Sequence, residues 1–313
     1  MAAWSEIDVH GEDYDEFAFL QGHAEWAGLP WDGPPAVERR AVDVGGGRRL
    51  SALLWGRGAP ELVLVHGAGQ NAHTWDTFAM ATNRPLVAVD LPGHGHSDWR
   101  DDRDYSPAAN GEALASLFDQ LAPDSEVVVG MSLGGLSSLR VAAGRPELVR
   151  RLVLVDITPG IGRRDADQPR PPVPTDLLAG PRTFESFQAL LDVTAATMPH
   201  RSPESIIPGL RHNSKPLEDG QWGWRYDQLF DPARMTADQP PPDMTPLWDD
   251  IRGLRIPTML VRGGRSPVVT DEAVARFVEH RPDARVETVP DAGHAVQNDK
   301  PLELAALVSD FVG

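Results

Sequence analysis

The sequence contains no cysteine, and this absence removes several kinds of chemistry at once. Thiol nucleophiles, disulfide bonds and cysteine-ligated zinc are all excluded. No apolar run approaches the roughly 20 residues that a membrane-spanning helix needs. The first residues also have neither the basic nor the apolar segment of a secretory signal. We therefore expect a cytoplasmic protein with no membrane partner.

Positive charge is also scarce. Lys and Arg together number 29 against 46 Asp and Glu, which gives a formal net charge of −17 at pH 7. A chain of this charge repels nucleic acid and anionic membrane surfaces, so we expect neither as a partner. The 313 residues and 41% apolar content allow one large α/β domain with an insertion.

The most informative stretch that is present covers residues 127–136, VVVGMSLGGL. Its β-branched run is typical of a buried strand, and leucines at helical spacing follow it. Between them Gly130-Met131-Ser132-Leu133-Gly134 fits the G-x-S-x-G pattern. The glycines permit a tight turn, because a Cβ there would crowd the neighbouring strand. Ser132 is thus predicted at a strand-to-helix turn that faces the helix's free N–H groups, which favours an oxyanion.

Apolar runs alternate with helical patterns along most of the chain. The predicted helices include residues 110–121, 271–279 and 302–311. This alternation is typical of a mostly parallel sheet with helices on both faces, an α/β fold. Eight strands are predicted, at residues 40–44, 50–55, 61–67, 85–90, 126–130, 152–155, 258–261 and 286–289.

Two regions break this alternation. Residues 160–250 contain proline clusters and helical fragments but no strong strand, and we expect a helical cap over the carboxyl ends of the strands. Residues 1–36 are acidic and rich in aromatic side chains. We expect this N-terminal extension to dock onto its own or a neighbouring subunit, which leaves a homo-oligomer open. The predicted core is then residues 37–159 and 251–313.

Five segments together resemble the α/β-hydrolase superfamily of serine hydrolases. The resemblance implies that Ser132 is the nucleophile and that His294, in a loop after the last strand, is its base. It also implies an oxyanion hole made by the backbone N–H groups of Ala68 and Leu133. The matching segments are residues 66–69 (HGAG), 90–97 (DLPGHGHS), 130–135 (GMSLGG), 154–156 (LVD) and 291–294 (DAGH).

The acid of the catalytic triad has two candidates. Many relatives carry it after the penultimate strand, but Ser266 occupies that position here. Asp271 follows and fits the N-cap or first turn of the next helix. Asp156, at the carboxyl end of the strand after the nucleophile helix, is the candidate that its position favours. Either aspartate keeps the chain order Ser, Asp, His.

Two other interpretations belong to different classes. His94, His96 and Asp98 satisfy the H-x-H-x-D spacing of binuclear metallohydrolases. Trp99 stands where those enzymes have a further histidine, and the same residues fit the hydrolase family's Gly-x-Gly-x-Ser loop, so we expect no metal and no cofactor. A non-catalytic receptor on the same scaffold is the second alternative. The presence of a serine, a histidine and a candidate acid argues against it.

Substrate choice is expected to lie in the insertion. Alternation in residues 221–226 puts Trp222, Trp224 and Tyr226 on one face of an extended segment. Packing of a small cap explains such residues, but one or two of them, with Met131, could wall an apolar pocket. The layout is similar to lactone hydrolases that open zearalenone, which implies an apolar ester or lactone substrate. A general carboxylesterase, or a carbon–carbon bond hydrolase of aromatic catabolism, is the alternative.

Overall fold

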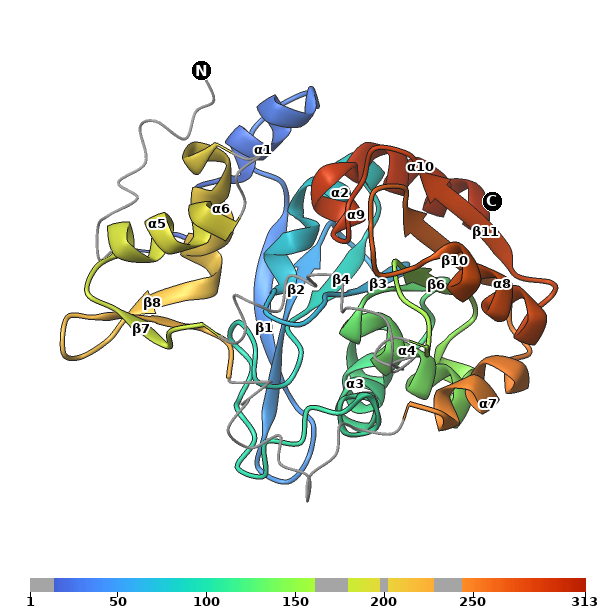
Figure 1. Ribbon diagram of the computed structural model, residues 1–313. Coiled ribbons are helices and arrows are strands. Elements are labelled where there is room, and N and C mark those ends of the chain that lie inside the picture. Colours follow the sequence, from blue (N-terminus) through green and yellow to red (C-terminus); the bar gives the residue numbers. More distant parts are fainter. Residues whose placement is uncertain (1–13, 161–179, 198–201, 228–243) are drawn as a thin grey trace, which may run out of the picture.

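An eight-stranded sheet forms the centre of the protein, in a computed structural model that describes residues 14–160, 180–197, 202–227 and 244–313 (Figure 1). The strand order is β1-β2-β4-β3-β5-β6-β10-β11. β2 runs antiparallel to its neighbours β1 and β4, and the other neighbouring pairs are parallel. The predicted mostly parallel, eight-stranded sheet is confirmed. Its strands are β1 (Val37–Asp43), β2 (Arg49–Trp55), β3 (Leu62–Val65), β4 (Leu86–Val89), β5 (Val127–Met131), β6 (Leu152–Val155), β10 (Thr258–Gly263) and β11 (Arg285–Val289).

Each face of the sheet has its own hydrophobic core. In β3, Val63 and Val65 belong to one core, whereas Leu62 and Leu64 belong to the other. This division follows from the period of two along a strand. One face is covered by α3 (Pro107–Leu121), α4 (Leu133–Gly144), α7 (Pro246–Gly253) and α8 (Asp271–His280) (Figure 1). The other is covered by α1 (Leu20–Ala27), α2 (Asp76–Thr82), α9 (Val296–Asp299) and α10 (Pro301–Val312). Short 3₁₀ helices are η2 (Ala72–Trp75) and η3 (Pro146–Leu148).

A separate unit lies between β6 and α7 in the chain, and we call it the insert (Figure 1). It consists of residues 180–197 and 202–227. Its strands form a three-stranded antiparallel sheet in the order β7-β9-β8. The insert therefore combines helices, as we expected, with short strands. We did not predict this sheet, although the alternation in residues 221–226 did indicate an extended segment there. Its elements are β7 (Thr183–Phe184), α5 (Phe187–Thr197), α6 (Pro203–Asn213), β8 (Ser214–Pro216) and β9 (Trp222–Trp224).

Helix α7 corrects one predicted boundary. It begins inside the stretch that we assigned to the cap, yet its Leu247, Trp248 and Ile251 pack into the main core beside α4. The core therefore resumes before residue 251. Residues 161–179, 198–201 and 228–243 of the predicted cap lie outside the described residues.

The described part of the N-terminal extension docks onto its own chain. Phe19 and Leu20 are almost fully buried, and α1 contacts α2. Arg39 of β1 pairs with Glu16 at 2.6 Å and with the fully buried Asp90 at 2.7 Å, so the extension, β1 and the loop after β4 share one ion-pair network. Docking onto a second subunit stays a prediction. No helix in the described ranges is both long enough and apolar enough to cross a membrane.

Candidate active site

Ser132 lies on the turn between β5 and α4. Its φ is +49° and its ψ is −120°, a backbone conformation that residues other than glycine seldom adopt. The Ser132 N–H donates to the carbonyl of Val155 over 3.1 Å, which ties the turn to β6. A Cβ on Gly134 would lie 2.3 Å from the His66 carbonyl oxygen, so only glycine allows the helix to approach this closely. The strained turn therefore holds the hydroxyl at the carboxyl edge of the sheet.

The carboxylate of Asp156 lies beside this turn and is fully buried. His294 Nδ1 lies 2.7 Å from Asp156 Oδ2, the Gly263 N–H donates to Oδ1 over 2.9 Å, and the Ser266 hydroxyl donates to Oδ2. An ionised carboxylate only accepts hydrogen bonds. The His294 proton is therefore held on Nδ1, which leaves Nε2 with its lone pair as the basic nitrogen.

Asp271, the other candidate acid, lies elsewhere. It is the first residue of α8, its side chain is 89% exposed, and it pairs with Arg262. Of the two aspartates left open by the sequence, the structure brings Asp156 and not Asp271 to His294. Ser266 is the residue whose part we missed. Ser266 occupies the position where an aspartate would be expected, and its hydroxyl instead donates a hydrogen bond to Asp156, the aspartate that follows β6.

His294 lies on the loop between β11 and α9. The Arg265 N–H donates to the Ala292 carbonyl over 2.9 Å, and the Gly293 N–H donates to Asp299 Oδ2 over 2.8 Å. These bonds fix the loop on both sides of the histidine. The imidazole itself is 14% exposed, so it is neither sealed in the core nor open to bulk water.

The loop after β3 is held by two histidines. The Leu91 N–H donates to His66 Nε2 over 3.0 Å, and His66 Nδ1 donates to the Gly67 carbonyl over 2.7 Å. In the same way the Gly69 N–H donates to His94 Nε2 over 3.1 Å, and His94 Nδ1 donates to the Pro92 carbonyl over 2.9 Å. Because each Nε2 accepts an N–H, both rings are neutral and carry their proton on Nδ1.

Burial favours the same neutral state. It lowers the pKa of His66 to about 4, although nearby Asp90 partly opposes the shift. Burial also lowers the pKa of His94 to about 3, with a further contribution from His66. Since backbone groups occupy both nitrogens of His94, the H-x-H-x-D metal interpretation finds no support.

Ala68 and Leu133, the predicted oxyanion donors, lie on the two segments that flank Ser132. A Cβ on Gly67 would lie 3.1 Å from Ser132 Cβ, so the loop of Ala68 passes directly beside the serine. Leu133 is the first residue of α4, and the first N–H groups of a helix have no acceptor within the helix. Ala68 also packs against the hydrophobic cluster of the insert.

The aromatic residues singled out for substrate binding form the core of the insert. Trp222, Trp224 and Tyr226 are 3–7% exposed and pack with Phe184 and Phe187. The Trp224 indole N–H donates to the Pro181 carbonyl over 3.0 Å. Met131 is likewise buried, in the core of the main sheet. Packing therefore accounts for these side chains, and their contact with substrate stays a prediction.

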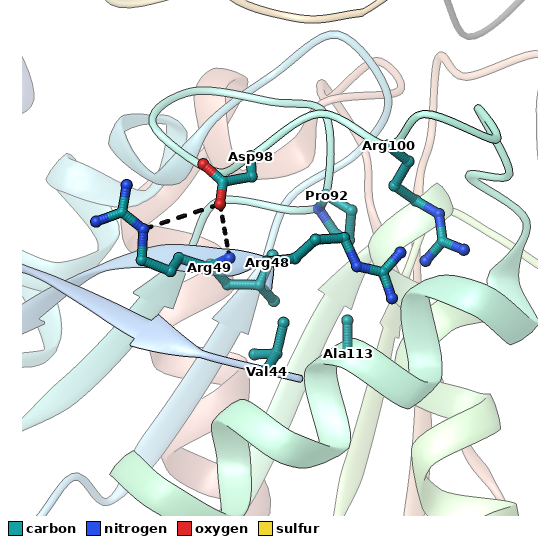
Figure 2. Close-up of a pocket in the computed structure, with 8 residues that line it drawn as sticks. Val44, Arg48, Arg49, Pro92, Asp98, Arg100 and Ala113 are labelled. Carbon is teal, nitrogen blue, oxygen red and sulfur yellow. Dashed lines mark hydrogen bonds and ion pairs between the residues drawn. The ribbon is translucent and has the colours of Figure 1, made fainter. Parts of the chain in front are cut away.

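A shallow surface pocket is lined by residues other than Ser132, Asp156 and His294 (Figure 2). Arg48, Arg49 and Arg100 contribute to its wall. The Arg49 side chain pairs with Asp98 at 3.8 Å, and the Arg100 side chain pairs with Asp102 at 2.7 Å. Acidic partners thus already satisfy two of the three arginines, which makes this pocket a poor anion site.

A model of the α/β-hydrolase family matches residues 62–307, which include Ser132, Asp156 and His294. The chain belongs to this family. It is 48% identical over 297 residues to the esterase Rv0045c of Mycobacterium tuberculosis, which covers 94% of each protein. It is 30% identical over 274 residues to the lipase LipV of the same organism, which covers 84% of this chain and 98% of that protein.

Solved structures agree with this assignment. The crystal structure of esterase Rv0045c from M. tuberculosis matches with a TM-score of 0.79 and 45% identity, over 95% of this chain and 97% of that one. E-2-(acetamidomethylene)succinate hydrolase matches with a TM-score of 0.73 and 26% identity, over 88% and 99%. Together the matches place this member of the α/β-hydrolase family among the hydrolases that act on ester bonds.

The two buried histidines generate a pH prediction. In the folded protein the pKa values of His66 and His94 lie below 6.5, the ordinary value for histidine in an unfolded chain. Below pH 6.5 the unfolded chain therefore binds protons at these histidines that the folded protein does not bind, which stabilises the unfolded state as the pH falls. The free energy of unfolding should therefore decrease between about pH 6.5 and pH 4. In His94→Gln one such group is absent, and denaturant titrations should show a shallower decrease. An unchanged slope in this variant would contradict the assignment.

Proposed function

We propose that Ser132, His294 and Asp156 form the catalytic triad of a serine esterase. The observation that carries the proposal is the hydrogen bond from His294 Nδ1 to the buried carboxylate of Asp156, at 2.7 Å. Asp156 directly follows Val155, whose carbonyl accepts the N–H of Ser132 on its strained turn. A serine hydroxyl is a weak nucleophile until a base takes its proton. With Nδ1 held by the carboxylate, His294 Nε2 is the nitrogen that would do so.

The reaction would then proceed in two halves. Ser132 Oγ attacks the ester carbonyl carbon while His294 Nε2 takes the hydroxyl proton, and the carbonyl oxygen becomes an oxyanion. The N–H groups of Ala68 and Leu133 would stabilise that charge. The carbon–oxygen bond to the alcohol breaks as His294 returns the proton to the leaving oxygen. Water, deprotonated by His294, attacks the acyl-enzyme and releases the acid and the free serine.

Two further groups would act by positioning the acid. The Gly263 N–H and the Ser266 hydroxyl hold the two oxygens of Asp156, so that the carboxylate cannot rotate away from the histidine. His66 and His94 would play a similar part for the oxyanion loop, because they fix the backbone on both sides of Ala68.

For the substrate we propose an uncharged open-chain carboxylic ester. Two relatives that match at 30% identity or more are named as an esterase and a lipase, which supports an ordinary ester. The insert packs an aromatic cluster against Ala68, so its apolar side reaches the loop beside Ser132. A net charge of −17 also disfavours a strongly anionic substrate. The zearalenone-type lactone is the narrower candidate, supported by the acid position after β6.

Substitution of the nucleophile tests the mechanism. Ser132→Ala should lower kcat for p-nitrophenyl butyrate by roughly 10⁴-fold or more, because no covalent intermediate can form. It should also abolish labelling by a fluorophosphonate probe. Ser138→Ala, on the same helix, is the control and should label like the unmodified protein. Labelling of Ser132→Ala at the native rate would refute the proposal.

The paired aspartates test the acid. Asp156→Asn keeps the side-chain shape but removes the charge that orients His294 and stabilises its protonated form, so kcat should fall by about 10⁴-fold. Asp271→Asn, a matched change at an exposed carboxylate, should leave kcat within about twofold because surface ion pairs contribute little. The reverse ranking, measured with the same ester, would transfer the acid role to Asp271.

A substrate panel separates the ester from the lactone. With p-nitrophenyl esters of increasing chain length, a simple γ-lactone and zearalenone, we expect kcat/KM to be highest for an open-chain ester. The expected margin over zearalenone is at least about tenfold, which corresponds to about 1.4 kcal/mol in the barrier. Faster ring opening of zearalenone than of every open-chain ester would make the protein a lactonase.

A further inference from the structure

Three side chains with metal-binding atoms meet at a junction away from the triad. His23 lies on α1, Asp76 is the first residue of α2, and His212 lies in the last turn of α6. One donor atom from each lies within 4.8 Å of the other two. Extension, core and insert thus converge there, as the positions of α1, α2 and α6 in Figure 1 also indicate.

Two of these donor groups are deeply buried and incompletely bonded. Asp76 is 1% exposed and His212 is 3% exposed. Asp76 Oδ1 and His212 Nε2 have no hydrogen-bond partner among the described residues. Buried polar atoms are almost always hydrogen-bonded in proteins, so two unpartnered atoms within one three-residue cluster indicate a further group that bonds to them.

The opposite atom of each side chain is anchored. His73 Nδ1 donates to Asp76 Oδ2 over 2.9 Å, and Tyr14 Oη lies 2.7 Å from His212 Nδ1. Metal binding at His212 Nε2 requires the tautomer in which Nδ1 carries the proton, and Tyr14 Oη is placed to accept the hydrogen bond from that N–H. Anchoring of this kind is how metal ligands are oriented in proteins, through a second bond on the far side of the ring or carboxylate.

We propose that His23, Asp76 and His212 bind a divalent transition-metal ion of the Zn²⁺ or Co²⁺ type. Imidazole nitrogen and carboxylate oxygen are ligands of these ions, and the chain has no cysteine to compete for them. Ligand atoms about 2.1 Å from one tetrahedral ion lie about 3.4 Å apart, so the side chains have to close by about an ångström. A fourth position is left for water.

The proposed ion would hold three segments together. It binds an arrangement that exists only in the folded chain, so it should raise the thermal unfolding temperature in proportion to its occupancy. It would also fasten α6 of the insert to α2, which follows the oxyanion loop through η2. No triad residue takes part, so the proposal stands or falls independently of the esterase mechanism.

Cobalt titration of the full, tag-free chain after removal of metal by chelator tests the site. We expect one Co²⁺ per chain with visible d–d absorption and a matching rise in unfolding temperature. His23→Ala and Asp76→Asn should each weaken binding by at least about tenfold, since each removes a direct ligand. His280→Ala, on α8, is the control and should bind cobalt like the unmodified protein.

Three results would overturn the proposal. The first is an absence of saturable cobalt absorption together with an unchanged unfolding temperature at millimolar Co²⁺, as expected if a water molecule alone bonds to the two unpartnered atoms. The second is equal affinity in His23→Ala, Asp76→Asn and the unmodified chain. The third is loss of binding in His280→Ala. If Asp76→Asn fails to fold, His23→Ala decides, because His23 is only partly buried and lies on a short surface helix.

Discussion

The buried carboxylate of Asp156 joins segments that lie more than 100 residues apart in the chain. It accepts bonds from the end of β10, from the loop that follows β10 and from the loop after β11. An unpaired charge at this depth would cost several kcal/mol, so these donors have to arrive together. Val155, the residue before Asp156, pairs in register with Val261. A one-residue slip of that register would turn the side chains of β10 to the other face of the sheet and would move Gly263 and Ser266 away from Asp156.

The sequence predicted the strands of the main sheet well because buried parallel strands are continuous apolar runs. It also placed Ser132 on its turn, since glycine is required where α4 approaches the His66 carbonyl at contact distance. The choice between Asp156 and Asp271 was different. It depends on β10 lying between β6 and β11, and strand order is a long-range property that no local pattern encodes. The sequence showed that Ser266 occupies the usual position of the acid, but it did not show that the Ser266 hydroxyl bonds to Asp156.

The same limit applies to side chains whose pattern fits two explanations. His94 satisfied a metallohydrolase spacing. Trp99 argued against that chemistry in the sequence, and the structure adds that backbone groups occupy both nitrogens of His94. The alternating aromatic residues around Trp222 correctly predicted that these side chains share one face. The pattern could not predict whether that face contacts a ligand or packs against Phe187, as it does in the structure. The junction of His23 and His212 left no local signal at all, because its residues lie far apart in sequence.

The ion pair between Arg39 and Asp90 has a consequence for how this protein can be shortened. The match to the family model begins at residue 62, so a truncation guided by that model would discard β1, β2 and the docked extension. Asp90 would then stay buried without its counter-ion, and β4 would become an open edge with unpaired backbone groups. Such a fragment would keep every residue of the proposed chemistry and still tend to aggregate. The segment that the family model matches is therefore shorter than the part of the chain that completes the sheet and pairs its buried charge.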